Sequence, residues 1–136
     1  MDLFVYGTLM YPEVLTALLG RVPDRSAGTA PGHRAAALPG RPYPGLVPHQ
    51  GGRATGLVLG GLTAAELRLL DAYENPRPAP DYAREPLTLD GGRRCVTYVW
   101  LGPVLPADWD AGAFAATTLD TYAAGCARWR ATYLNG

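Results

Sequence analysis

The chain has 136 residues, 48% of them apolar and 18% charged, so it is long enough for one buried core and too apolar for a disordered segment. Twelve acidic residues balance twelve basic ones, which argues against nucleic acid or an anionic membrane as the main partner, because either would require a basic face. We expect a single domain over residues 1–136 and a small-molecule partner. All the basic residues are arginine, which is typical of a GC-rich genome and favours a bacterial source.

The first dozen residues predict a strand, a tight turn and the start of a helix. Leu3 to Tyr6 form a short apolar and aromatic run, as expected for a buried strand, and Gly7 ends it. Thr8 is expected to cap the helix, and Pro12 lies where the first turn of a helix tolerates proline. Apolar residues then repeat at helical spacing, at Val14, Leu15, Leu18 and Leu19.

The turn at Gly7 has two interpretations. Glycine lets the backbone approach a ligand closely, and successive N–H groups at such a turn can point together at a carboxylate or an oxyanion. A single glycine is also common in an ordinary strand-to-helix turn, and this stretch alone favours the ordinary turn.

Short strands broken by glycine and proline are expected after the first helix, which Gly20 and Pro23 end. The pattern predicts strands at His33 to Leu38, Tyr43 to Val47, and Ala54 to Leu59. Strands this short leave few exposed edges only in a closed or strongly curled sheet. Tyr43 could place a phenol at a pocket mouth, although one tyrosine alone favours core packing.

Leu62 to Tyr73 is the clearest predicted helix. Thr63 and Glu66 form a capping box at its start, and Glu74 lies just past its end. A carboxylate beside an aromatic wall is desolvated, which raises its pKa and suits it to proton transfer. Tyr82-Ala83-Arg84 then enters a strand after a proline-stiffened loop.

The remaining residues carry no catalytic signature. Cys95 and Cys126 lie in no metal-binding motif, so a zinc site is not expected and a disulfide is left open, while His33 and His49 are expected at the surface. The N-terminus lacks a signal-peptide pattern and no run is long enough to span a membrane, so we expect a cytoplasmic protein. An aromatic stripe predicts a C-terminal helix or helical pair on the core, with a dimer face as the minority interpretation: Phe114, Leu119, Tyr122, Ala123, Cys126, Trp129 and Tyr133.

Four motifs together resemble the γ-glutamylcyclotransferase-like family, including its avirulence-induced and γ-glutamylamine cyclotransferase branches. They are FVYGTL at residues 4–9, GLVP at 45–48, LDAYE at 70–74 and YAR at 82–84. The resemblance covers most of residues 1–101, in the same order as in the family. It implies an α+β fold with a small mixed β-barrel and flanking helices, and a pocket over the YGTL turn.

The resemblance also implies roles for particular residues. Tyr6, Gly7, Thr8 and Leu9 would hold the α-amino acid end of a γ-glutamyl substrate, and Glu74 would act as acid and base. The substrate's own amine would close the ring to 5-oxoproline, so no metal and no cofactor are expected.

Two further tyrosines complete the predicted site. Tyr82 and Tyr98 are included among the substrate-binding residues, with a core role for Tyr98 as the alternative, while Arg84 is expected to be structural. The proline-rich loop from Asn75 to Asp81 puts the position of Tyr82 in question and is expected to influence the choice of leaving group. A non-catalytic binding module with the same barrel and pocket is the alternative function, and a monomer or weak homodimer is expected.

Overall fold

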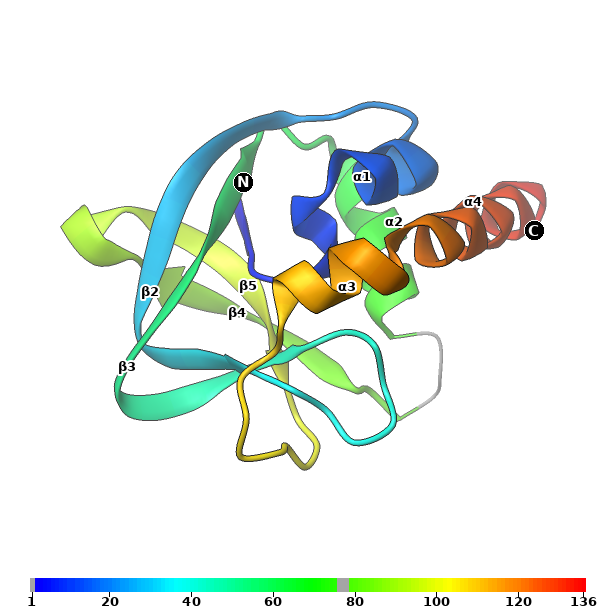
Figure 1. The fold of residues 1–136 in the computed structure, drawn as a ribbon. Helices are drawn as coiled ribbons and strands as arrows, with labels where there is room; N and C mark the ends of the chain where they lie inside the picture. Colours follow the sequence, from blue (N-terminus) through cyan, green and yellow to red (C-terminus); the bar gives the residue numbers. More distant parts are fainter. Residues whose placement is uncertain (1, 76–78) are drawn as a thin grey trace.

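A mixed sheet flanked by helices makes up the computed structural model, which describes residues 2–75 and 79–136 (Figure 1). The elements are β1 (Leu3–Val5), α1 (Pro12–Leu19), β2 (Asp24–Ala36), β3 (Gly45–Gly60), α2 (Ala64–Glu74), β4 (Tyr82–Thr88), β5 (Arg94–Trp100), α3 (Ala111–Thr117) and α4 (Leu119–Asn135). Two 3₁₀ turns lie at Thr8–Met10 and Asp90–Gly92. The predicted α+β class and the predicted C-terminal helical pair are confirmed.

The five strands form one sheet in the order β2-β3-β1-β5-β4. β1 runs antiparallel to β3 and parallel to β5, and β3 also pairs with β5 where Leu46 lies opposite Val99. Because β3 pairs with β1 near one end and with β5 near the other, the sheet must curl. It is not closed into the predicted barrel, since β2 and β4 remain its two edges among the described residues.

The long hairpin of β2 and β3 replaces the short strands predicted from the sequence. The predicted break between Leu38 and Tyr43 is confirmed, because β2 ends at Ala36 and β3 begins at Gly45. The predicted break at Gly51 is instead a bend within β3, and the strand expected to begin at His33 is the last part of β2. The register shifts beyond Pro31, and Gly32 and Gly51 adopt positive φ angles of 70° and 77° there. Glycine occupies such angles without the steric cost of a Cβ atom. The prediction was wrong because a glycine that bends a strand resembles one that ends it.

Local signals at the helices were mostly accurate. α1 begins at Pro12 and ends at Gly20, whose φ of 75° is left-handed, and the capping box of Thr63 and Glu66 begins α2. The predicted Thr8 cap was wrong. Thr8 lies inside the 3₁₀ turn, and its buried side chain makes no capping hydrogen bond, because Tyr11 occupies the N-cap position of α1.

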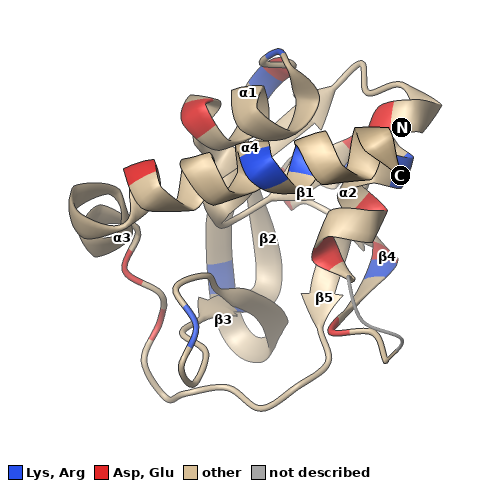
Figure 2. Cartoon of the chain, turned by 90° about the vertical axis from the view of Figure 1, so that its right-hand side faces the viewer, with Lys and Arg blue, Asp and Glu red and all other residues tan. Residues whose placement is uncertain are grey.

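The helices pack their apolar residues against β1 and the adjoining strands, and Phe114, Leu119 and Cys126 from the C-terminal pair are buried in this core. Cys95 and Cys126 are both buried free thiols. Figure 2 shows acidic and basic residues interspersed on the helical side of the molecule. Within the described residues, no helix has the length and hydropathy needed to cross a membrane.

Candidate active site

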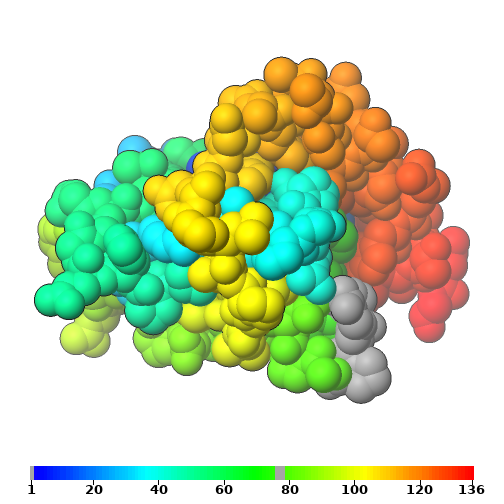
Figure 3. All heavy atoms as spheres, turned by 60° about the horizontal axis from the view of Figure 1, so that its bottom comes forward, coloured from blue at the N-terminus to red at the C-terminus, as the bar shows by residue number. Residues whose placement is uncertain are grey.

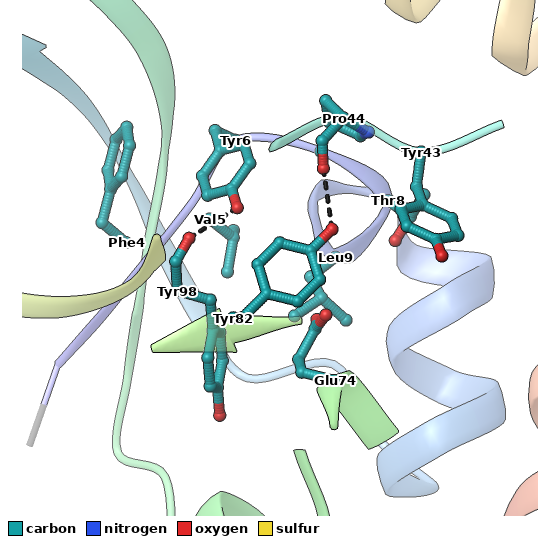
Figure 4. A pocket seen from close by; sticks show the side chains of 11 residues that line it. Phe4, Val5, Tyr6, Thr8, Leu9, Tyr43, Pro44, Glu74, Tyr82 and Tyr98 are labelled. Atoms are coloured by element: carbon teal, nitrogen blue, oxygen red, sulfur yellow. Dashed lines mark hydrogen bonds between the residues drawn. The ribbon is translucent and has the colours of Figure 1, made fainter. Parts of the chain in front are cut away.

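One pocket brings together residues from both halves of the chain (Figure 4). Its described lining comes from β1 and the turn after it, the segment before β3, the end of α2, and strands β4 and β5: Phe4, Val5, Tyr6, Gly7, Thr8, Leu9, Tyr43, Pro44, Glu74, Tyr82 and Tyr98. All the residues predicted for the site therefore line the same pocket. Their roles in binding and catalysis stay predictions.

The pocket is open to solvent on one side. The space between its lining atoms is about 370 Å³ when the open mouth is included. A ligand that does not fit in the enclosed part therefore extends through the mouth.

The Gly7 turn passes directly beneath Pro44. A Cβ atom on Gly7 would lie 2.6 Å from Cγ and 2.8 Å from Cδ of Pro44, so only glycine fits without displacing the proline. The carbonyl of Gly7 accepts from the N–H of Met10 at 3.0 Å. Within the described residues, the N–H groups of Gly7, Thr8 and Leu9 have no hydrogen-bond partner, which leaves them available beside the pocket.

Glu74 reaches the pocket from the last turn of α2 and is only partly exposed. Burial raises the pKa of Glu74 to about 8, and the negative charge of Asp71, one turn earlier on the same helix, adds in the same direction. A carboxyl group with this pKa can both accept and release a proton near neutral pH.

Three tyrosines of the pocket use their hydroxyl groups within the protein. Tyr6 donates to the carbonyl of Tyr98 at 2.6 Å, and Tyr82 donates to the carbonyl of Pro44 at 2.9 Å (Figure 4). Tyr98 donates to Oδ1 of Asp71 at 2.6 Å. Burial also raises the pKa of each of these phenols, so they remain protonated. They can form walls of the pocket, and their hydrogen bonds fix its shape.

Asn75 determines where Tyr82 lies. Oδ1 of Asn75 accepts from the N–H groups of Asp81 and Tyr82 at 3.1 and 3.0 Å, and its Nδ2 donates to the carbonyl of Tyr82 at 3.0 Å. This clamp holds Tyr82 next to the end of α2. The predicted effect of the loop on the leaving group concerns residues 76–78 in part, and these lie outside the described residues.

Arg84 has the structural contact expected of it. Its Nη1 donates to Oδ2 of Asp71 at 2.9 Å, so Asp71 joins Arg84 and Tyr98 behind the pocket.

Two sets of contacts at the site could not be predicted from any sequence motif. Pro44 closes one side of the pocket through its contacts with Gly7 and Tyr82. Behind Glu74, Tyr73 donates to the hydroxyl of Tyr122 on α4 at 2.6 Å, and the Thr8 hydroxyl interacts with the same phenol. Aromatic spacing predicted that Tyr122 would pack on the core, but no sequence pattern could show that it meets Thr8.

Comparison with known families accounts for this arrangement. Residues 3–113 match the family model described as "Gamma-glutamyl cyclotransferase, AIG2-like". The chain belongs to this family. The matched range contains Glu74, the Gly7 turn and the rest of the described pocket lining, whereas α4 lies beyond it.

Curated relatives in this family include plant proteins. AIG2-like protein C of Arabidopsis thaliana is 40% identical over 113 residues, which cover 80% of this chain and 66% of that protein. AIG2-like protein D of the same plant is 34% identical over 118 residues, covering 80% and 75%. The chain thus spans about two thirds to three quarters of the length of these relatives. The expected bacterial source stays a prediction.

Solved structures share the fold. A solution structure of an Arabidopsis thaliana protein matches with a TM-score of 0.66 and 29% identity, covering 91% of this chain and 86% of that one. A structure named gamma-glutamyl cyclotransferase matches with a TM-score of 0.60 and 13% identity, covering 92% and 85%. At 13% identity the second match supports the fold alone.

Proposed function

We propose that this protein is a cyclotransferase that converts γ-glutamyl amides or peptides into 5-oxoproline and a free amine. The observation that carries the proposal is the meeting of Glu74 and the Gly7 turn in one pocket, although the two are far apart in sequence. Membership of the γ-glutamyl cyclotransferase, AIG2-like family supports the reaction class.

The reaction needs little from the protein beyond orientation and proton transfer. The α-amine of the substrate attacks its own γ-carbonyl carbon, a C–N bond closes the five-membered ring, and the C–N bond to the leaving amine breaks. A folded conformation of the bound substrate supplies proximity, for which effective molarities of about 10⁵ M or more are known.

Glu74 carries the proton between the two nitrogens in this proposal. Its carboxylate takes a proton from the attacking amine and returns it to the leaving nitrogen. The unpaired N–H groups of the Gly7 turn can donate to the substrate carboxylate or to the oxyanion that develops on the γ-carbonyl.

A panel of γ-glutamyl compounds tests the proposal, with release of 5-oxoproline as the readout. The compounds should include γ-glutamyl amino acids, glutathione, γ-glutamyl polyamines and γ-glutamyl-ε-lysine, because the leaving amine is not fixed by the reaction. Release of 5-oxoproline from one or more of them is expected. Ligands that raise the melting temperature without any 5-oxoproline would instead favour a binding module.

Turnover is expected to continue unchanged in the presence of a chelator. Neither the intramolecular attack nor proton transfer by Glu74 requires a Lewis acid, and the described residues include no group of three or more His, Cys, Asp or Glu side chains suited to a metal ion. The measurement is 5-oxoproline release with and without EDTA. Activity that EDTA abolishes and a divalent ion restores would contradict this prediction.

The replacement Asp71→Asn is expected to shift the pH dependence of the reaction. Because Asp71 raises the pKa of Glu74, its loss should lower that pKa, and the acid limb of kcat/KM, expected near pH 8 in the wild type, should move to lower pH. Arg84→Gln is the opposite test. It removes the cation that pairs with the negative charge of Asp71, so the acid limb should move to higher pH. A limb that stays in place in both variants would remove Asp71 from this role.

A further inference from the structure

The mouth of the pocket lies between Tyr43 and Glu74. Every other described lining residue is buried, whereas these two are partly exposed. When the reacting atoms of a bound ligand lie next to the Glu74 carboxyl, the rest of the ligand therefore extends out of the pocket past Tyr43. In Figure 4, Tyr43 stands on the opposite side of the pocket from Tyr98, next to Thr8.

Tyr43 also differs from the other tyrosines of the pocket in its hydrogen bonding. The hydroxyls of Tyr6, Tyr82 and Tyr98 all donate to acceptors within the protein. For the hydroxyl of Tyr43, the described part of the chain offers no hydrogen-bond partner. Its ring and its hydroxyl group are both available to a ligand.

The backbone around Tyr43 is held in place by hydrogen bonds on both sides, and its ring packs against the core while remaining partly exposed. The carbonyl of Pro42 accepts from Nε1 of Trp109 at 2.9 Å, and the carbonyl of Pro44 accepts from the Tyr82 hydroxyl at 2.9 Å. Figure 3 shows the segment around residue 40, in cyan, lying at the surface beside the segment around residue 105, in yellow. A fixed backbone that carries a partly exposed aromatic ring is an arrangement suited to ligand selection.

The chemistry of the reaction decides which part of the substrate Tyr43 meets, and this step rests on the function proposed above. The γ-glutamyl part is common to all substrates and must lie inside, between the Gly7 turn and Glu74. The leaving amine varies in size, receives its proton from Glu74, and so extends through the mouth.

We propose that Tyr43 selects the leaving amine, with its ring packing against an aliphatic or aromatic substituent on the scissile nitrogen. The pocket is thereby suited to amides of alkyl or aryl amines more than to the unsubstituted amide.

Three γ-glutamyl amides of increasing size test this assignment: L-glutamine, γ-glutamyl methylamide and γ-glutamyl n-butylamide. In Tyr43→Ala, kcat/KM for the butylamide should fall about tenfold, within the range that a few methylene groups in an apolar site provide, while glutamine should change less than about twofold. Tyr43→Phe keeps the ring and should keep the preference for the butylamide. Tyr133→Ala, at an exposed position on α4, is the matched control and should change none of the three rates.

The results of these assays test the role of Tyr43 separately from the proposed cyclotransferase reaction. An equal fall for all three amides in Tyr43→Ala, or no fall at all, would overturn it. If the wild type binds the amides in calorimetry but releases no 5-oxoproline, the reaction is wrong, and the assignment then stands only if Tyr43→Ala weakens binding of the butylamide selectively. If none of the amides binds or reacts, both are wrong.

Discussion

Glu74→Gln is expected to lower turnover by about 10²- to 10⁴-fold, the usual contribution of a positioned acid and base. Glutamine keeps the size and most of the hydrogen bonding of the carboxyl group but cannot carry a proton between two nitrogens. Initial rates of 5-oxoproline release measure the effect. Glu85→Gln is the matched control, because Glu85 is exposed on β4 and does not line the pocket.

The same replacement should leave the fold intact and should stabilise it at alkaline pH. The folded-state pKa of Glu74, about 8, lies above its usual value, so between the two values the folded chain holds a proton that the unfolded chain has released. The wild type therefore loses stability as the pH rises through that range, and Glu74→Gln should not show this loss. Denaturant unfolding at pH 5 and pH 9 provides the comparison.

Undiminished turnover in Glu74→Gln would rule out Glu74 as the proton carrier. The binding-module alternative makes a different forecast, since a binding protein has no rate to lose and its affinity for an ammonium group should fall in the Gln variant. Measuring affinity and turnover on the same preparations distinguishes the two.

The sequence predicted those features of the fold that neighbouring residues determine. The capping box at Thr63 and Glu66, the proline at the start of α1 and the glycine at its end are all local, and each lies where the pattern indicated. The β2–β3 hairpin was predicted in pieces, because a glycine such as Gly51 can bend a strand as well as end it, and only the pairing between the two strands shows that they continue.

The candidate site shows the same division between local and distant information. Motif resemblance brought Glu74 and the Gly7 turn together, and the pocket contains both. The hydrogen bonds that occupy Tyr6, Tyr82 and Tyr98 were beyond prediction, because each acceptor lies at least 27 residues away along the chain. For the same reason the sequence could not single out Tyr43 as the pocket tyrosine with a free hydroxyl.

Gly7→Ala is expected to reduce both stability and turnover. The new methyl group would overlap the ring of Pro44 at 2.6 Å, and this ring cannot rotate away as a flexible side chain could. Overpacking of this kind costs about 1 to 3 kcal/mol of the free energy of unfolding. Because Tyr82 bonds the carbonyl of Pro44, any shift of the proline also disturbs a second wall of the pocket.

The matched control is Gly125→Ala, in the interior of α4. There a Cβ atom meets only an ordinary contact at 3.6 Å, and alanine should stabilise the helix by about 1 kcal/mol. Denaturant midpoints should therefore move in opposite directions for the two variants, while 5-oxoproline release, assayed well below both melting temperatures, should fall only in Gly7→Ala. If Gly7→Ala matches the wild type in both measurements, Pro44 can retreat without consequence, and the close fit between Gly7 and Pro44 is not what shapes the pocket.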